Sequence, residues 1–207
     1  MSISQSINSM SRRVPAWAVY IVAIGYSAWL FYLGITGGLG VEPIKALEHA
    51  YGLLGLQFLI AGLAITPLRK WAGVNLIKFR RAIGLMTFYY ILLHLLVWLV
   101  LDVQILSQIW ADILKRKYIT IGMIAFVLMV PLAVTSNNWA VRKIGPVKWR
   151  RLHKATYAVA IMGAVHFLWL VKGIQLEPIL YTCAIVVLLA ARLDFKSFPK
   201  SNTARAT

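Results

Sequence analysis

The sequence predicts an all-α integral membrane protein whose six transmembrane helices pack as a bundle. Hydrophobic residues make up 60% of the 207-residue chain and charged residues only 14%, whereas a soluble domain is about half apolar and about a quarter charged. The apolar residues gather into six blocks, each close to the ~20 residues that cross a bilayer as a helix. Most Lys and Arg residues lie between these blocks.

The expected spans, in chain order, are residues 16–36, 51–68, 82–101, 118–135, 152–171 and 176–191. The first block is too long for the core of a signal peptide, so we expect a retained helix. Pro67 is expected to end the second span and Pro131 to kink the fourth. The chain then divides into an N-terminal segment (1–15), a transmembrane domain (16–192) and a tail (193–207), with the first dozen and last ten residues mobile.

Charge is distributed unevenly between the two sides of the predicted bundle. Most of the 22 Lys and Arg residues fall in the N-terminal segment, between spans two and three, between spans four and five, and in the tail. Every acidic residue except Asp194 falls on the opposite side, where the run 115–117 is the main basic exception. Because short basic loops stay in the cytoplasm, both termini are predicted to be cytoplasmic. The net charge of +16 is thus a topology signal rather than evidence of nucleic-acid binding.

Two connections on the outer side have patterns of their own. The stretch GITGGLGVEP (34–43) lacks the βαβ context of a dinucleotide site. It predicts a helix C-cap and a tight turn, with a docking surface as the alternative. In the link 102–117, Ile105, Ile109 and Ile113 recur at helical spacing, which predicts a helix lying flat on the membrane surface.

Two histidines, His94 and His166, lie inside predicted spans. Ionisable groups within a membrane are costly and usually functional, although a neutral imidazole can also simply bond to a neighbouring helix. The two residues lie about 12 and 14 residues from the inner ends of spans that run in the same direction, so they can face each other. Facing imidazoles in a bundle core are suited to hold a haem iron as axial ligands, whereas a zinc site needs more ligands.

His153 lies near the inner end of the same span as His166, about 20 Å away along a helix. It is a candidate ligand of a second, inner haem, or an interfacial histidine in a basic loop. Thirteen residues do not return to one face of a straight helix, so we expect a bend near Gly163. Arg80, fourteen residues before His94, shares that residue's face and is a candidate partner for a haem propionate or for the inner site.

The remaining sequence features narrow the class of function. His49, at the outer mouth of the second span, is either a water-accessible interfacial residue or part of a quinone or proton-handling site. The single cysteine, Cys183, excludes an intrachain disulfide and a cysteine-held iron–sulfur cluster. Glu177, at the outer end of the sixth span, is the only Asp or Glu within the predicted spans, which disfavours a carboxylate-based ion pathway. No polar stretch is long enough for a nucleotide-binding domain.

The motifs GGLGVEPIKALEH, ITPLRK, RRAIGLMTFYYILLHLL and WRRLHKATYAVAIMGAVHFLW resemble the MsrQ (YedZ) family, the haem-binding membrane subunits of the periplasmic methionine-sulfoxide reductase system. The resemblance covers roughly residues 34–192. Wider relatives, the ferric-reductase-like transmembrane domains, carry two histidines on each of two helices and stack two b haems. The resemblance implies that His94 and His166 hold an outer haem and His153 an inner one, with Arg80 departing from the pattern at the fourth position.

The resemblance also implies a bacterial inner-membrane location and electron transfer. Electrons would pass from the quinone pool through one or two haem b groups to a periplasmic molybdopterin-containing subunit that reduces methionine sulfoxide in oxidised proteins. It implies FMN as well, although no motif locates a flavin here. We expect a one-to-one complex with that subunit. A stand-alone transmembrane ferric or cupric reductase and a haem-free transporter or assembly factor are the alternatives.

Overall fold

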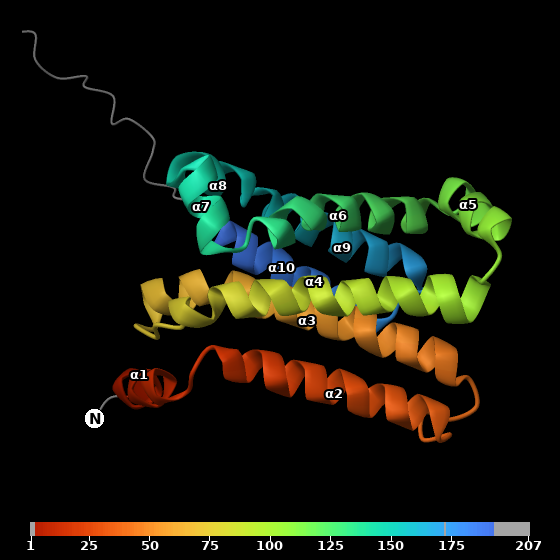
Figure 1. The fold of residues 1–207 in the computed structure, drawn as a ribbon, viewed down its shortest axis with the longest axis horizontal. Helices are drawn as coiled ribbons and strands as arrows, with labels where there is room; N and C mark the ends of the chain where they lie inside the picture. Colours follow the sequence, from red (N-terminus) through yellow and green to blue (C-terminus); the bar gives the residue numbers. More distant parts are fainter. Residues whose placement is uncertain (1–2, 172, 193–207) are drawn as a thin grey trace, which may run out of the picture.

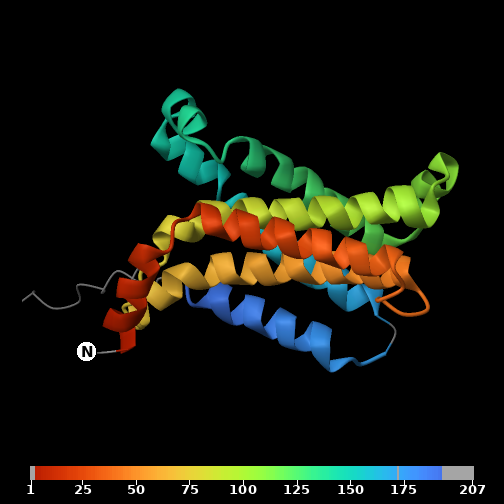
Figure 2. The ribbon, with the colours of Figure 1, turned by 60° about the horizontal axis from the view of Figure 1, so that its bottom comes forward.

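The fold is a bundle of roughly parallel and antiparallel helices (Figures 1 and 2). It is seen in a computed structural model that describes residues 3–171 and 173–192; the predicted tail at 193–207, including Asp194, lies outside the described residues. The bundle is built from α2 (Trp17–Ile35), α3 (Pro43–Trp71), α4 (Arg80–Leu96), α6 (Lys117–Val134), α9 (Ala155–Leu170) and α10 (Leu176–Ala190). The π-helix η2 (Val97–Val103) continues α4, and the 3-10 turn η1 (Ile77–Phe79) precedes it.

Four helical segments are long and apolar enough to cross a membrane, namely Trp17–Ile35, Pro43–Trp71, Ile77–Val103 and Lys117–Val134. Helices α9 and α10 have 16 and 15 residues, fewer than the ~20 of a typical span. Helix α9 packs against α6 and α10, and α10 also packs against α3. A helical membrane domain is therefore confirmed, and the fifth and sixth spans remain predictions.

Helix α3 differs from the predicted second span at both ends. It begins at Pro43, where the missing N–H suits the first turn of a helix, and it ends at Trp71. The predicted stop at Pro67 is wrong, since the helix continues past it. Proline has no N–H to donate to the carbonyl four residues earlier, and a side chain supplies the missing donor. That carbonyl belongs to Leu63, four residues earlier, and the Nη2 of Arg192 donates to it at 2.6 Å.

The core lies between α3, α9 and α10. Buried residues of these helices and of α6 form one cluster, namely Leu56, Leu59, Leu63, Met129, Val159, Ala160, Ala164, Phe167 and Ile185. Helix α2 is attached through buried tyrosine hydroxyls of its neighbours: Tyr51 donates to the carbonyl of Ser27 and Tyr90 to that of Ala23. The rest of α2 exposes large apolar side chains, as expected of a helix that faces lipid.

The N-terminal segment is ordered, in contrast to the mobility expected of it. Residues Ile3–Arg13 form helix α1. The Asn8 side chain donates to the Gly73 carbonyl at 2.9 Å and accepts from the Asn75 N–H at 2.8 Å. Helix α1 is thereby held against the connection between α3 and α4 (Figure 2).

The opposite end of the bundle, where α2 ends, α3 begins and α5 (Leu106–Lys115) lies, is called the α5 end below. The glycine-rich turn there is confirmed: Gly37 has φ +80° and the Gly38 N–H donates to Leu33, which is a Schellman C-cap. Helix α5 is also confirmed. Ile109 and Ile113 pack on the bundle, whereas Ile105, Leu106, Trp110 and Leu114 are exposed, so the position of α5 on the membrane surface stays a prediction.

We predict that Arg192→Ala lowers the free energy of unfolding by about 1–3 kcal/mol, because it leaves the Leu63 carbonyl without its side-chain donor. In a Pro67→Ala background the loss should be smaller, because the substituted residue supplies the backbone N–H that proline lacks. Denaturant titration in detergent of the wild type, both single variants and the double variant measures this coupling. Equal losses in the two backgrounds would contradict the assignment.

Candidate functional site

A cavity of about 290 Å³ lies between α3, α4, η2, α6 and α9 and opens at the α5 end. Its size is at the lower end of small-molecule sites, which run from roughly 300 to 1,000 Å³. Most of the wall is apolar or glycine. His94 of α4 and His166 of α9 both line it, on opposite sides.

The two imidazoles face each other, as the sequence predicted from their matching depth. Their ring centres are 6.3 Å apart and their planes are inclined at 82°. Two imidazoles that bind one metal ion from opposite sides, with metal–nitrogen bonds of about 2 Å, have ring centres roughly 6 Å apart. The observed separation therefore suits one metal ion between them.

Each of these imidazoles is oriented by a backbone carbonyl of a neighbouring helix. The Nδ1 of His94 lies 2.9 Å from the carbonyl oxygen of Glu48 in α3. The Nδ1 of His166 lies 2.7 Å from that of Tyr118 in α6. A carbonyl oxygen can only accept, so each Nδ1 carries the proton and each Nε2 keeps its lone pair. This is the state in which metal-binding histidines are usually held.

A glycine makes room for each of these contacts. Gly52 and Gly122 follow Glu48 and Tyr118 by four residues, one helical turn. A Cβ atom at Gly52 would lie 3.0 Å from the Nδ1 of His94, and one at Gly122 would lie 2.8 Å from that of His166. Sequence reasoning missed both glycines, although a glycine inside an apolar helix is itself a sign of close approach.

These features fit a haem group held by two axial imidazoles. The Nε2 nitrogens are unprotonated, the separation of the ring centres is suitable, and the cavity is lined mostly by apolar residues and glycines with charged residues at its mouth. Zinc is disfavoured, since the described residues contain no cluster of three or more His, Cys, Asp or Glu side chains that could hold a metal.

His153 is in a different state. It follows α8 (Pro146–Leu152) directly, its ring stacks on Trp149 at 3.8 Å, and its Nε2 lies 3.0 Å from the hydroxyl of Thr135. That hydroxyl donates to the carbonyl of Pro131 at 2.6 Å, so toward His153 it accepts. The Nε2 of His153 therefore carries a proton and is not free to bind iron in this arrangement.

Arg80 and His153 do not meet. The Nη2 of Arg80 donates to the hydroxyl of Thr66 at 2.7 Å, and Arg80 lines neither the main cavity nor a second one of about 80 Å³ beside His153. The two cavities are neighbours and share Leu59, Thr87, Met129 and Val159. The residues present thus do not fit a second haem as they fit the first.

The geometry between His153 and His166 also differs from expectation. We expected a bend at Gly163, but Gly163 lies inside the continuous helix α9. The helix is instead interrupted at His153 and Lys154, where α8 has ended and α9 has not yet begun. His166 thus belongs to α9 and His153 precedes it, so their thirteen-residue spacing does not require a bend within α9.

The mouth of the main cavity is charged. Its charged lining residues are Lys45, Glu48, Asp102 and Arg116. Glu48 lies within α3 and Asp102 within η2, both beyond the ends of the predicted spans 51–68 and 82–101, because these helices extend further than the spans. His49 also lines this cavity, with its ring 6.1 Å from that of Phe167.

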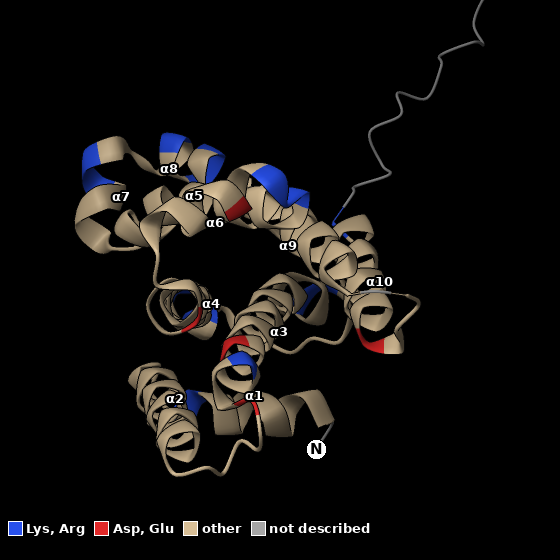
Figure 3. Cartoon of the chain, turned by 90° about the vertical axis from the view of Figure 1, so that its right-hand side faces the viewer, with Lys and Arg blue, Asp and Glu red and all other residues tan. Residues whose placement is uncertain are grey.

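Charge differs between the two ends of the bundle. Figure 3, a view from the α5 end, shows acidic residues on α3, on η2 where it continues α4, and on α10, and basic residues on α7 (Asn138–Ile144) and α8. The basic residues of α7 and α8 include Arg142, Lys143, Arg150 and Arg151. Every described acidic residue lies at or near the α5 end, as the sequence predicted.

Comparison with known proteins places the chain among membrane redox proteins. Residues 49–164 match the family described as "Ferric reductase like transmembrane component". The chain is 47% identical over 197 residues to the "Protein-methionine-sulfoxide reductase heme-binding subunit MsrQ" of Agrobacterium fabrum, covering 93% of this chain and 91% of that protein. It is 47% identical over 178 residues to the protein of the same name from Brucella ovis, covering 86% and 80%. No solved structure matches the chain.

We predict that Gly122→Ala sharply reduces the haem bound per chain, because the added Cβ displaces the imidazole of His166 from the Tyr118 carbonyl. Gly84→Ala is the matched control, since a Cβ there meets no atom within 4 Å. The haem content of the purified variants, measured by the pyridine haemochrome method, checks this. Equal content in the two variants would show that the glycine is not needed.

Proposed function

The chain belongs to the MsrQ family of heme-binding subunits, and from this premise we propose that it is a b-type cytochrome that carries electrons to a methionine-sulfoxide reductase. The observation that carries the proposal is the pair His94 and His166, 6.3 Å apart with both Nδ1 atoms bound to carbonyls. The match to the ferric-reductase-like transmembrane component supports an electron-transfer role.

In this proposal the two histidines bind the iron through Nε2. Haem held in this way supplies a one-electron carrier whose potential depends on its axial ligands, hydrogen bonds and burial. The carbonyls of Glu48 and Tyr118 fix the imidazole tautomers and strengthen both nitrogens as ligands. The apolar walls exclude water from the site.

The orientation in the membrane is part of the proposal. The basic residues of α7 and α8 mark the cytoplasmic side by the positive-inside rule. Both termini then lie in the cytoplasm, and the α5 end, with its haem, faces the periplasm. A location in the bacterial inner membrane follows from the periplasmic partner.

The donor and the acceptor are other molecules. The described residues form a membrane bundle without a separate domain for a nicotinamide or flavin. We propose that the quinone pool supplies electrons and that a periplasmic molybdopterin-containing subunit receives them in a one-to-one complex. The relatives' name, which makes them subunits of a reductase, supports a catalytic partner. His49, at the mouth of the cavity, is a candidate for quinone or proton handling, while FMN has no candidate site among the described residues.

A second haem at His153 requires a rearrangement. The Thr135 contact must break before Nε2 is free, and Arg80 must leave Thr66 to approach a propionate. We therefore propose one haem at His94 and His166 as the stable core of the protein, and treat His153 and Arg80 as candidate residues of an inner site that forms only if haem binds there.

We predict a b-type reduced-minus-oxidised spectrum from the purified wild type that is lost in His94→Ala and in His166→Ala. Removing one axial imidazole leaves the iron with a single protein ligand in a lipid-facing bundle. His153→Ala should keep the spectrum, and a fall from two haems to one in that variant would establish the inner site.

A wild-type protein that stays colourless when haem is supplied would overturn the cytochrome assignment and favour a haem-free transporter or assembly factor. A coloured protein that reduces ferric or cupric ions without any partner would favour the stand-alone reductase.

A further inference from the structure

The cavity is chemically uneven along its length. Its inner part is lined by apolar side chains and glycines, and its charged residues lie at the α5 end. Haem has the same unevenness, with an apolar macrocycle and two carboxylates on one edge. A ligand of this kind enters with its apolar part inward and its carboxylates at the mouth.

Among the described residues that line the cavity, two carry a permanent positive charge, Lys45 and Arg116. They come from different parts of the bundle, and each stands close in sequence to a residue that orients an axial histidine. Lys45 precedes Glu48 by three residues in α3, and Arg116 precedes Tyr118 by two. One cation thus belongs to each of the two helix pairs that hold the histidines, Lys45 to α3 beside α4 and Arg116 to the start of α6 beside α9.

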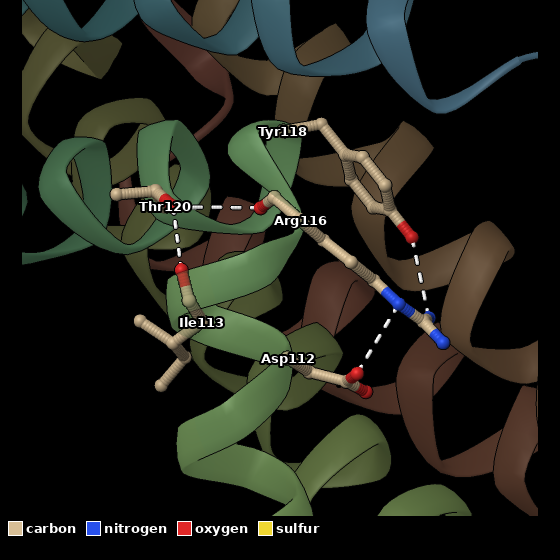
Figure 4. Close-up of polar contacts among 5 residues, drawn as sticks. All are labelled: Asp112, Ile113, Arg116, Tyr118 and Thr120. Carbon is tan, nitrogen blue, oxygen red and sulfur yellow. Dashed lines mark hydrogen bonds and ion pairs between the residues drawn. The ribbon is translucent and has the colours of Figure 1, made fainter.

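The guanidinium of Arg116 is held in place from two directions (Figure 4). Its Nη1 donates to the Tyr118 hydroxyl at 3.4 Å, and its Nε lies 3.2 Å from the Asp112 carboxylate. The hydrogen bond to Tyr118, and to a smaller extent the charge of Asp112, raise the pKa of Arg116 above its usual value. A guanidinium has five N–H donors, so further donors remain for an anion.

The junction between α5 and α6, which contains Arg116, is itself held by hydrogen bonds. The hydroxyl of Thr120 donates to the carbonyl of Ile113 near the end of α5 and lies 3.4 Å from that of Arg116 (Figure 4). Tyr118 links the two parts of the site: its hydroxyl accepts from Arg116 and its carbonyl accepts from His166. The position of the cation is thus tied to the position of the axial ligand.

We propose that Lys45 and Arg116 bind the two propionates of the haem held by His94 and His166, with Asp112 and Tyr118 as positioning residues. Lys45 is paired with Glu42 at 3.2 Å in an exposed contact, which is weak enough to exchange for a propionate. Glu48 and Asp102 share the mouth and oppose the propionates, which makes the two cations necessary. The proposal rests on the proposed function and adds the orientation of the haem, with its propionate edge at the α5 end.

The experiment compares haem with its dimethyl ester, in which both carboxylates are uncharged. The apoprotein in detergent is titrated with each, for the wild type, Lys45→Gln, Arg116→Gln and the double variant. We expect each single change to weaken haem binding about three- to tenfold, the size of an ordinary net hydrogen bond, because both cations are partly exposed to solvent. The wild type should bind the ester more weakly than it binds haem. The variants should bind the ester as tightly as the wild type does.

Lys117→Gln is the matched control. It removes the same charge one residue away from Arg116, on an exposed side chain that does not line the cavity. Arg116→Lys is a second variant that keeps the charge but loses the fork geometry, so it should restore part of the affinity for haem.

The midpoint potential of the bound haem gives an independent readout. A nearby cation stabilises the reduced haem, so Lys45→Gln and Arg116→Gln should lower the midpoint potential. Each tenfold change in the equilibrium constant for one-electron reduction corresponds to about 59 mV. Lys117→Gln should leave the potential nearly unchanged.

Three outcomes separate the hypotheses. A wild type that binds neither haem nor its ester refutes the proposed function itself. The propionate assignment alone is refuted if the wild type binds haem and its ester equally. It is also refuted if Lys45→Gln and Arg116→Gln bind haem as tightly as Lys117→Gln does. Weaker haem binding with unchanged ester binding supports it, and unchanged ester binding also shows that the variants are folded.

Discussion

The contact on which the site depends is an imidazole N–H that donates to a backbone carbonyl of an adjacent helix. It occurs twice, from His94 in α4 to Glu48 in α3 and from His166 in α9 to Tyr118 in α6. These are also the two helix pairs in most extensive contact. The bundle can be described as two helix pairs, each joined at the α5 end by one such bond over a glycine, with the cavity between the pairs. The separation of the two imidazole rings, 6.3 Å between their centres, follows from how the pairs pack.

Polar groups of the bundle are satisfied in two ways, by bonds between helices such as that from Tyr90 to Ala23 and by bonds within one helix. Thr87 donates to the carbonyl of Ile83 and Thr182 to that of Pro178, each four residues earlier. Such local bonds are the economical solution where no water is present. Pro67 leaves the carbonyl of Leu63 without a backbone donor. Arg192, which follows α10, donates to this carbonyl. The two imidazoles join their helix pairs through Nδ1, and the Nε2 atoms of these two cavity-lining residues are left to bind a ligand.

Counting along the sequence was enough to place His94 and His166 at one depth, because both spans are regular helices that run in the same direction. Counting was not enough for His153, whose tautomer depends on Thr135, which comes from the end of α6 and is distant in sequence. The second and third spans were predicted shorter than the helices because apolar windows stop at charged residues such as Glu48, although the backbone continues as a helix. The sequence gives only a weak signal for the π-helix after His94 and for the glycines beside the two imidazoles. Each of these features depends on the side chains of the neighbouring helix, which the local sequence does not reveal.

The asymmetry between the two ends bears on the route of the electrons. The cavity suited to haem lies at the α5 end, whereas α3, with 29 residues, is roughly 43 Å long at about 1.5 Å per residue. At the other end, His153 is held by Thr135 and Trp149 in a form that does not bind iron. In the proposed orientation, a donor confined to the cytoplasm would be separated from this site by most of the bundle's length, with no carrier between them among the described residues. A quinol dissolved in the bilayer can approach the side of the bundle at any depth, and His49 lies at the mouth of the same cavity. The single well-formed site among the described residues therefore favours a membrane-dissolved donor over a soluble one, in agreement with the electron source proposed above.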